Sequence, residues 1–374
     1  MPKILRSSPA APFLSAAAIK HLVRWYHHHR RDLPWRRTRN PYAIWISEIL
    51  LQQTQVETVR PYFFRFLKAF PTVDALSAAP IDDVLKVWEG CGYYARARHL
   101  HRAAQEIAQR GEFPKTAREW QSLPGIGPYT AAAIASIAYD EPVPVIDGNV
   151  ERVLARVLCE RREIKSPSVV KRLRNTAQTI MRIAAGAKLS PGDLNQAMME
   201  LGATVCMPRR ALCEECPLAA ECRAHQALSD VTVLPRKTPK KAIPHYEIGA
   251  AIIEKSGKLL ITQRPLSGLL GGLWEFPGGK QHVGETLEEC VAREIEEELG
   301  IQITVGDLFA RVKHAYSHFK ITLHVFKCKP KSGRIQKLAV ADYRWITPAE
   351  LPNYAFPKAD RVVIEKLKES GSEQ

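Results

Sequence analysis

The spacing of apolar residues divides this chain into two parts. From about Ala16 to Ala227, apolar residues recur every three or four positions between prolines and glycines, as in amphipathic helices. After Tyr246, short runs rich in β-branched and aromatic residues flank one amphipathic helix over residues 287–299. The pattern predicts a helical domain followed by a domain of α/β or α+β class.

The segment between these parts has the composition of a linker. Residues 229–246 read SDVTVLPRKTPKKAIPHY, and their three prolines and four Lys/Arg residues favour an extended, exposed connection. A chain of 374 residues is also longer than one hydrophobic core usually organises. We therefore expect one domain at residues 1–227, a linker at 228–246 and a second domain at 247–374.

The net charge adds an expectation about the partner. A formal charge of +15 favours a polyanion, either a nucleic acid or an anionic membrane surface. No run approaches the roughly 18 apolar residues that a spanning helix requires. Pro12 and Ser15 interrupt the one segment with some character of a signal peptide. We expect a cytoplasmic protein that binds nucleic acid and no membrane.

Four of the eight cysteines lie close together in the sequence. Cys206, Cys213, Cys216 and Cys222 have the spacing C-x6-C-x2-C-x5-C, whereas the other four are scattered. In a chain without an export signal, such a group indicates metal ligation rather than disulfides. Thiolates bind zinc as well as iron-sulfur clusters, so the spacing alone leaves the metal open.

A glycine-rich turn is a candidate phosphate site. Residues 123–130 read LPGIGPYT, and Gly125 and Gly127 permit a tight turn ahead of a helix. Backbone N–H groups at a helix N-terminus can hold a DNA phosphate without reading the base sequence. Turns of this composition also occur without any ligand, so the motif gains meaning only beside the cysteines and the basic charge.

Two carboxylates have surroundings that suit acid chemistry. Seven of the other eight residues of 43–51 are apolar, so Glu48 is expected to be buried, and burial raises the pKa of a carboxyl group. Asp147 follows an apolar run and precedes a predicted helix. The residues alone also allow a glutamate that pairs with an arginine and an aspartate that caps a helix.

Five blocks stand out in the helical part: LPWR (33–36), WISEILLQQTQV (45–56), GCGYYARAR (90–98), DGN (147–149) and NQAMMELG (195–202). They resemble the characteristic blocks of the adenine glycosylase branch of the endonuclease III superfamily of DNA repair enzymes, and the resemblance covers most of residues 20–225. It implies a multidomain protein whose first domain is an all-α helix-hairpin-helix fold. It also implies that the four cysteines of the loop 206–222 hold a [4Fe-4S] cluster.

The resemblance implies roles for individual residues. Glu48 would protonate the adenine and Asp147 would stabilise the sugar cation at C1′, with help from Asn149 and Tyr129. The residues expected around the extruded base are Leu33, Trp35, Arg36 and Gln196. Those expected at the vacated duplex are Gln52, Gln53 and Tyr93.

These roles imply a monofunctional glycosylase acting on double-stranded DNA with adenine opposite 8-oxoguanine or guanine, and we expect the protein to be monomeric. Such an enzyme must flip the base out, protonate it and stabilise an oxocarbenium-like sugar. An endonuclease III-like glycosylase and lyase would instead need a lysine in the position of Tyr129. An iron-sulfur DNA-binding protein without catalysis is an alternative of another class.

In the second part, the segment Gly279–Ile301 reads G-x5-E-x7-R-E-I-x-E-E-x-G-I, with fixed positions at Gly279, Glu285, Arg293, Glu294, Glu297, Glu298 and Gly300. This pattern matches the complete Nudix signature. Three of the glutamates, at 294, 297 and 298, share one helix face, where hard carboxylate oxygens suit Mg²⁺ and a bound diphosphate. The alternative is an acidic amphipathic helix that only covers a sheet.

Residues 314–319, HAYSHF, are similar to the loop with which adenine glycosylases read 8-oxoguanine, with Tyr316 where phenylalanine is usual. Tyr316, Ser317 and His318 are therefore expected at the lesion. In that family this Nudix-like domain has usually lost the acidic signature. Its retention leaves open whether the domain only reads DNA or also hydrolyses free 8-oxo-dGTP. A nucleotide pyrophosphohydrolase fused to a DNA-targeting domain is the corresponding alternative.

Overall fold

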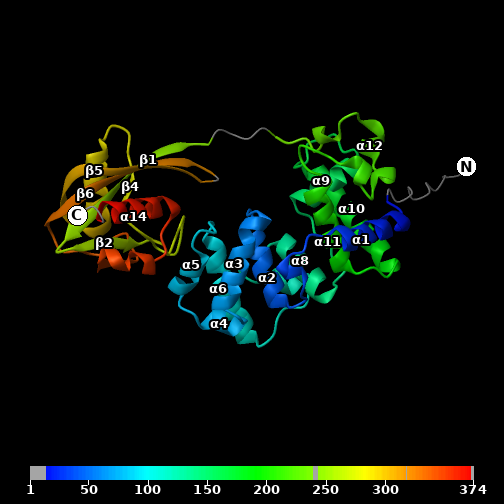
Figure 1. Ribbon diagram of the computed structural model, residues 1–374, viewed down its shortest axis with the longest axis horizontal. Helices are drawn as coiled ribbons and strands as arrows, with labels where there is room; N and C mark the ends of the chain where they lie inside the picture. The colour runs from blue at the N-terminus through cyan, green and yellow to red at the C-terminus, as the bar shows by residue number, and fades with distance from the viewer. Residues whose placement is uncertain (1–13, 239–242, 317, 372–374) are drawn as a thin grey trace, which may run out of the picture. The chain divides into compact units, whose positions relative to one another are not determined.

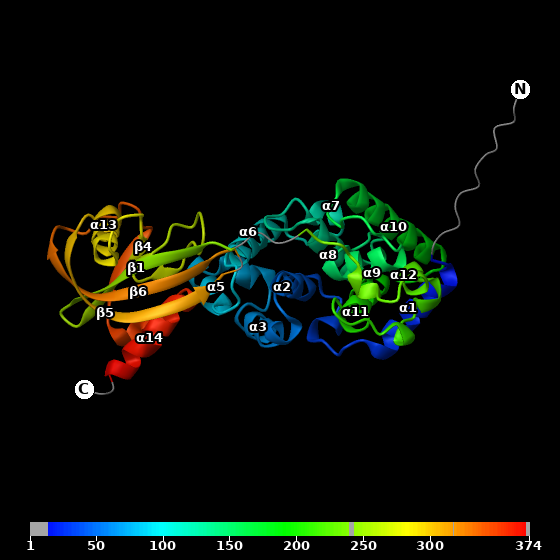
Figure 2. The same cartoon turned by 90° about the horizontal axis from the view of Figure 1, so that it is seen from above.

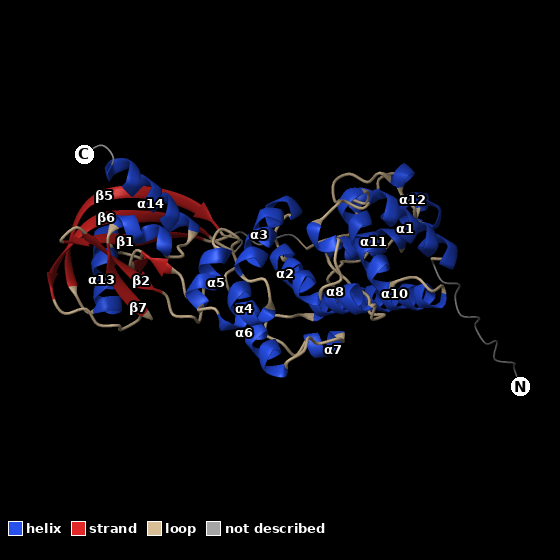
Figure 3. Cartoon of the chain, turned by 60° about the horizontal axis from the view of Figure 1, so that its bottom comes forward, coloured by secondary structure: helices blue, strands red, loops and turns tan. Residues whose placement is uncertain are grey.

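The computed structural model describes residues 14–238, 243–316 and 318–371. Helices make up the ordered elements before residue 234, and the described strands all follow residue 244, as Figures 1 and 3 show. The change from helices to strands that the sequence predicts is therefore confirmed. None of the described helices is long and apolar enough to cross a membrane.

Contacts group the chain into two compact units that do not follow the order of the sequence. The first unit contains residues 1–63 and 106–239, and the second contains residues 64–105 and 240–374. The helical segment 64–105 thus packs with the C-terminal part of the chain. The predicted linker at residues 228–246 stays a prediction, and its residues 239–242 lie outside the described part.

The first unit is built from helices. Its α-helices are α1 (Ala16–His29), α2 (Pro41–Leu51), the start of α3 (Val56–Ala69), the end of α6 (Ala95–Arg110), α7 (Ala117–Trp120), α8 (Pro128–Tyr139), α9 (Gly148–Val157), α10 (Pro167–Gly186), α11 (Pro191–Thr204) and α12 (Arg223–Ala227). Its short 3-10 helices are η1 (Pro34–Arg36), η2 (Cys213–Glu215), η3 (Ala219–Glu221) and η4 (Val231–Val233).

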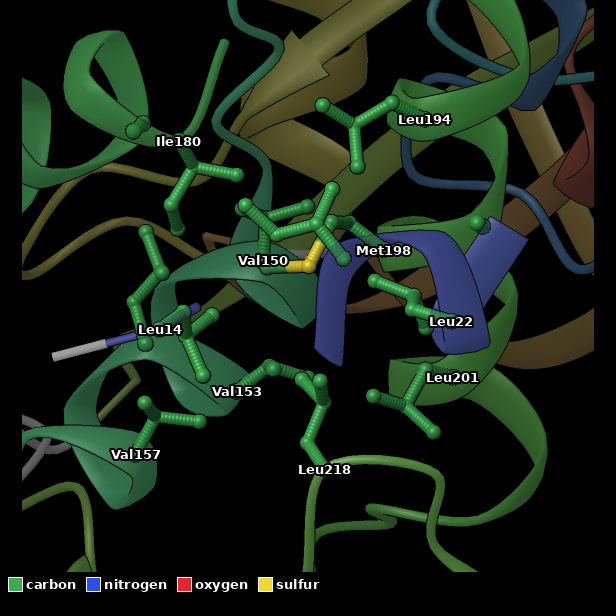
Figure 4. Packing of buried hydrophobic residues seen from close by; sticks show 14 of the residues in the cluster. Leu14, Leu22, Val150, Val153, Val157, Ile180, Leu194, Met198, Leu201 and Leu218 are labelled. Carbon is green, nitrogen blue, oxygen red and sulfur yellow. The ribbon is translucent and has the colours of Figure 1, made fainter. Parts of the chain in front are cut away.

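The apolar faces of α1, α9, α10 and α11 form one core, shown in Figure 4. On α9, Val150, Val153 and Val157 are buried at intervals of three and four residues, which places them on one side of the helix. Leu22 of α1 and Met198 of α11 belong to the same cluster. Because each such buried side chain contributes about 1.5–3 kcal/mol, this core fixes the face that α9 turns outward.

The second unit combines helices with a sheet. Its elements are the end of α3, α4 (Val73–Ala78), α5 (Ile81–Trp88), the start of α6, β1 (His245–Lys255), β2 (Lys258–Gln263), β3 (Trp274–Glu275), β4 (Gly278–Lys280), α13 (Leu287–Leu299), β5 (Gln302–Ala315), β6 (Lys320–Ser332), β7 (Asp342–Ile346), the 3-10 helix η5 (Pro348–Asn353) and α14 (Lys358–Gly371).

The seven described strands form one mixed sheet with the order β3-β2-β1-β6-β5, in which β4 pairs with β1 and β7 with β2. Only the β1–β6 pair is parallel among these pairings, and it runs from His245 opposite Lys320 to Ile253 opposite Cys328. The fold class expected for this part, an α/β Nudix-like domain, is confirmed.

The sheet is covered by a helix on each face, as Figure 2 shows. Alternate residues of β1 point to opposite faces. Ile252 belongs to the cluster that includes Val363 of α14, whereas Ile253 belongs to the cluster that includes Ile295 of α13. Ile295 thus packs on the sheet, whereas Glu294 on the same helix lies against Gly279 of β4.

Candidate active site

Glu48 lies on α2, a helix whose sequence leaves it almost no polar face. Asn40 caps the helix by accepting hydrogen bonds from the backbone N–H groups of Tyr42 and Ala43, and Pro41 occupies the first turn. Glu48 is only 5% exposed, so the burial expected from its neighbours is confirmed. Burial raises the pKa of Glu48 to about 7, with the nearby charge of Asp147 adding to the shift.

Tyr129 holds the carboxyl group of Glu48 in place. It is the second residue of α8, and its hydroxyl donates to Glu48 Oε2 over 2.9 Å. The same hydroxyl lies 3.7 Å from the sulfur of Met199 on α11. The hydrogen bond from Tyr129 lowers the pKa of Glu48, but by less than burial raises it. The glutamate is therefore oriented by a neutral donor rather than by an arginine.

Asp147 stands at the N-terminus of α9 and has two polar partners. Its Oδ1 accepts from the backbone N–H of Val150 over 2.7 Å, and its Oδ2 accepts from Asn149 Nδ2 over 2.9 Å. Burial raises the pKa of Asp147, and these hydrogen bonds act in the opposite direction. The helix-capping role that the residues alone allow is thus present, and it coexists with a position beside Glu48.

The polar face of α9 connects this site to the cysteine loop. Arg152 donates to Asn149 Oδ1 over 2.8 Å, to the carbonyl of Gly202 over 2.6 Å and to that of Cys206 over 2.8 Å. One turn later, Arg156 contacts the sulfur of Cys206 at 3.2 Å. Both guanidinium groups are buried, so each satisfies several backbone carbonyls that would otherwise lack a donor.

Asn195 of α11 fixes the segment that leads to Asp147. Its side-chain oxygen accepts from the backbone N–H of Val145 over 3.0 Å, and its amide donates to the carbonyl of Val143 over 2.8 Å. A third hydrogen bond joins it to Ser136 of α8. The buried side-chain amide thus satisfies backbone N–H and carbonyl groups of residues 143–145, as a neighbouring strand would in a sheet.

Glu200 anchors two arginines beside the site. The carboxylate is fully buried and accepts from the backbone and side chain of Arg31 and from Arg36 Nη2 at 2.7 Å. Burial alone would raise the pKa of Glu200, but these donors lower it to about 2. The position of Arg36 is therefore set by a fixed negative charge.

These groups line one cavity of about 220 Å³ within the first unit. The expected site residues that line it are Leu33, Trp35, Arg36, Glu48, Tyr129, Asp147, Asn149 and Gln196. Gln52, Gln53 and Tyr93 do not belong to this lining. Gln52 donates to Thr130 over 3.1 Å, while Gln53 and Tyr93 adopt the left-handed backbone region that non-glycine residues rarely occupy.

The glycine turn before α8 has the conformation that its sequence suggests. Gly125 has a φ of 74°, and Gly127 is the N-cap of α8, where its carbonyl accepts from the backbone N–H of Ala131. Pro128 follows as the first helical residue. The backbone N–H groups at the start of this twelve-residue helix therefore lie in the same turn as Tyr129.

The four clustered cysteines line a common small cavity together with Arg156. Cys206 and Ala211 form an isolated antiparallel bridge, and the two 3-10 helices η2 and η3 carry the next two turns of the loop. Within the described residues, no group of three or more His, Cys, Asp or Glu side chains is arranged around one metal-ion position.

The glutamates of the Nudix signature surround Arg293 on α13. Arg293 donates to Glu285 over 2.8 Å and to Glu294 and Glu297 over 3.0 Å each. The carboxylate of Glu294 occupies the space that a Cβ atom at Gly279 would take, so this side chain packs closely against β4. The Oε2 atom of Glu298 is buried without a hydrogen-bond partner in the described part of the chain.

The expected reading loop joins β5 to β6. The backbone N–H of Tyr316 donates to the carbonyl of Phe319 over 2.8 Å, and the ring of Tyr316 contacts those of His314 and Phe319. His318 is exposed, and Ser317 lies outside the described residues. Among the described residues of the loop, His318 is thus exposed beside the rings of Tyr316 and Phe319.

Comparison with known proteins connects this geometry to a family. Residues 46–179 match the HhH-GPD superfamily of base excision DNA repair proteins, and residues 249–366 match the NUDIX domain. The chain is 35% identical to the adenine DNA glycosylase of Rattus norvegicus, over 94% of this chain and 78% of the relative. It is 35% identical to that of Homo sapiens, over 92% and 72% of the two chains.

The chain belongs to the adenine DNA glycosylase family. As a member of this family it is a base excision repair glycosylase that binds DNA and hydrolyses N-glycosyl bonds. The resemblance inferred from the sequence is confirmed. So is the order of a helical helix-hairpin-helix domain followed by a Nudix-like domain.

Several residues around the site of this adenine DNA glycosylase family member were not predicted from the sequence. They are Arg31, Arg152, Arg156, Asn195 and Glu200. Arg152 and Arg156 are four residues apart on a helix whose other side is apolar, and Asn195 and Glu200 stand in the block NQAMMELG (195–202). This spacing and this block were the visible signals. The partners of the two arginines at Gly202 and Cys206 lie 50 or more residues away in the sequence.

The contact between Gly202 and Asn149 gives a prediction for this family member. A Cβ atom at residue 202 would lie 2.6 Å from the Cβ of Asn149, so Gly202→Ala should push α9 away from α11. Such overpacking costs about 1–3 kcal/mol of stability, and the displaced Asn149 should slow base release as well. Thermal unfolding and single-turnover base release measure the two effects.

Gly186→Ala is the matched control. Gly186 ends α10, and a Cβ atom there would meet no atom within 4 Å, so the change should be neutral or slightly stabilising. If Gly202→Ala were as stable and as active as Gly186→Ala, then the close approach of α11 to Asn149 would be required neither for stability nor for base release.

Proposed function

We propose that this family member excises adenine paired with 8-oxoguanine or guanine in double-stranded DNA and leaves an abasic site. The observation that carries the proposal is that Glu48, Tyr129 and Asp147 surround one cavity of about 220 Å³. A cavity of about 150 Å³ can hold a benzene ring, so this volume suits one flipped base.

The proposed reaction uses the two carboxyl groups in different protonation states. Glu48, whose pKa of about 7 keeps much of it protonated near neutral pH, donates its proton to a ring nitrogen of the adenine. The glycosidic bond then breaks, and its electron pair leaves with the base. The Asp147 carboxylate stabilises the positive charge that develops at C1′. A water molecule adds to C1′ and gives its proton to the Glu48 carboxylate.

The cavity favours hydrolysis without strand cleavage. Among the described residues that line it there is no lysine, and Tyr129 fills the position at which the competing lyase would need an amine. The test is to incubate the protein with a duplex that contains adenine opposite 8-oxoguanine, with and without alkali. Free adenine with strand breaks only after alkali is expected, and strand breaks without alkali would refute the monofunctional assignment.

Recognition of the base opposite the adenine is assigned to the β5–β6 loop. Exposed His318 beside Tyr316 supports this assignment, together with the resemblance of residues 314–319 to the family's reading loop. The extruded adenine would contact Leu33, Trp35, Arg36 and Gln196, whereas Gln52, Gln53 and Tyr93 would act at the vacated position. The protein is proposed to work as a monomer.

The four cysteines are proposed to hold a [4Fe-4S] cluster. They line one cavity, and Arg156 donates to the sulfur of Cys206, as suits a thiolate that carries negative charge. When bound, the cluster would cross-link the loop through its cysteines. The loop would then present Arg209 and Arg210 to DNA in a fixed conformation.

Removal of one ligand should therefore bleach the protein. The purified protein should be brown and contain iron, and Cys213→Ser should lose most of the iron and the broad visible absorption. DNA binding should weaken as well, because the loop would lose its organisation. Cys328→Ser, at a buried cysteine of β6 outside the group, is the control and should keep its colour. Stoichiometric zinc instead of iron would overturn the assignment.

A second activity, hydrolysis of free 8-oxo-dGTP, is proposed for the Nudix signature. The buried and unpartnered Oε2 atom of Glu298, on the same helix as Glu294 and Glu297, supports a cation such as Mg²⁺ at this face. The full-length protein with Mg²⁺ should convert 8-oxo-dGTP to the monophosphate and pyrophosphate. A Glu297→Gln/Glu298→Gln variant should lose this activity. Absence of turnover in the unaltered protein would leave the domain as a reader only.

A further inference from the structure

Two charged residues of α5 make contacts with the C-terminal half of the same compact unit. Lys86 Nζ donates to the carbonyl of Tyr354 over 2.9 Å, and Glu89 Oε1 accepts from the backbone N–H of Phe356 over 3.0 Å. The two side chains also pair with each other at 2.9 Å. The pair thus binds the segment that leads from η5 into α14.

Further contacts join the same surfaces. Asp82 of α5 accepts from Gln263 at the end of β2 over 2.9 Å, and Arg98 of α6 donates to the carbonyl of Gly271 over 2.7 Å. Leu85 lies so close to Gly272 that a Cβ atom there would meet it at 2.8 Å. The helical segment is therefore joined to the Nudix-like domain by both packing and directed hydrogen bonds.

Glu89 is also the residue directly before the turn 90–93, which contains Tyr93. Three of the four residues 90–93 have positive φ angles, and Tyr93 is the one of these three that is not glycine. The carbonyl of Gly92 accepts from Trp88 Nε1 over 3.0 Å, and the carbonyl of Glu89 accepts from Arg65. Tyr93, a non-glycine residue in the left-handed region, keeps this backbone conformation only when its surroundings hold it.

We propose that Lys86 and Glu89 are positioning residues that tie the lesion-reading domain to the Tyr93 turn, so that discrimination between 8-oxoguanine and guanine depends on them. The proposal rests on the proposed function, in which the Nudix-like domain reads the opposite base and Tyr93 acts at the vacated one. Neither residue touches the cavity of Glu48. They act by holding two DNA-contacting segments at one spacing.

The pair is built more strongly than an ordinary surface ion pair. The Lys86 and Glu89 side chains are 34% and 15% exposed, and each also binds a backbone group of the partner segment. Charge-assisted hydrogen bonds in such half-buried places are roughly twice as strong as neutral ones. Glu112 and Lys115 have the same three-residue spacing, but both are largely exposed, so that pair supplies a matched control.

The test uses the full-length protein and three variants: Glu89→Gln, Lys86→Met and the control Glu112→Gln. Base release is measured on duplexes with adenine opposite 8-oxoguanine and opposite guanine, at limiting and at saturating enzyme. Binding of both duplexes is measured by anisotropy with the Glu48→Gln change added to each variant. Melting temperatures are recorded so that loss of fold is recognised.

We expect Glu89→Gln and Lys86→Met each to lower the preference for 8-oxoguanine over guanine by about tenfold, which is the effect of losing one charged hydrogen bond. The rate on the guanine duplex at saturating enzyme should not change, and Glu112→Gln should keep the full preference. A purely structural role would weaken binding of both duplexes equally, and that result would overturn the proposal. A full preference retained in both variants would overturn it too.

The proposed function can fail separately from this inference. If the unaltered protein released adenine but showed no preference between the two duplexes, the reading role of the domain would be wrong, and the inference would fall with it. If the unaltered protein showed the preference and the α5 variants retained it, only the inference would be wrong. If one of the two variants, Glu89→Gln or Lys86→Met, has a lowered melting temperature, the inference is tested with the other variant.

Discussion

Glu48→Gln is expected to reduce single-turnover adenine release by about 10²–10⁴, the usual contribution of a general acid. The change keeps the size of a side chain that is only 5% exposed and removes its acidic proton. Tyr129 can still donate to the amide oxygen, so the cavity should keep its shape. Binding of the mismatched duplex, measured by anisotropy, should stay within a few-fold of the unaltered protein.

The dependence of the rate on pH provides a second readout of the same group. Because the pKa of Glu48 is raised to about 7, the acid form is lost as the pH rises through 7, and the rate should fall there. Glu106→Gln, at a glutamate of α6 outside the cavity, should leave both rate and profile unchanged. Undiminished base release by Glu48→Gln would show that another group supplies the proton.

Asp147→Asn is expected to slow base release by about 10²–10³, the usual loss when one electrostatic partner of a transition state is removed. The substitution separates the two roles of this residue. Asparagine caps a helix about as well as aspartate does, so the hydrogen bond from the Val150 N–H and the start of α9 should persist. The melting temperature should therefore change little while the rate falls.

Asp230→Asn is the matched control for this substitution. Asp230 also accepts from a backbone N–H at a helix start, that of Thr232, but it is exposed and lies outside the cavity. Its rate and stability should both match the unaltered protein. A loss of stability in Asp147→Asn that accounted for its loss of rate would mean that the residue only caps α9.

Local sequence patterns were sufficient for the features that depend on near neighbours. The apolar stripe over residues 287–299 has the bounds of α13, and the apolar surroundings of Glu48 foretold its burial. The apolar run at residues 249–253 forms only part of β1 (His245–Lys255), because β1 pairs with β6 along residues that have little apolar character of their own. The apolar pattern of the sequence thus located these elements, and the pairing of β1 with β6 set the length of the strand.

Contacts between distant residues could not be predicted in this way. Glu200 and Arg31 are 169 residues apart, and nothing in the sequence near either indicates the other. The same holds for the segment 64–105, whose helical pattern places it with the first domain. Its polar contacts from Asp82, Lys86 and Glu89 belong to the second unit. A charged residue in a helix pattern gives no information about a partner that is distant in the sequence.

The buried Glu200 has a consequence for how measurements on this protein can be interpreted. With a pKa of about 2, it keeps its negative charge throughout the range in which Glu48 titrates. Arg31 and Arg36 remain paired with it throughout that range. This trio is therefore a constant electrostatic background beside the cavity. A titration seen in the rate or in base binding can be assigned to other groups, Glu48 first among them.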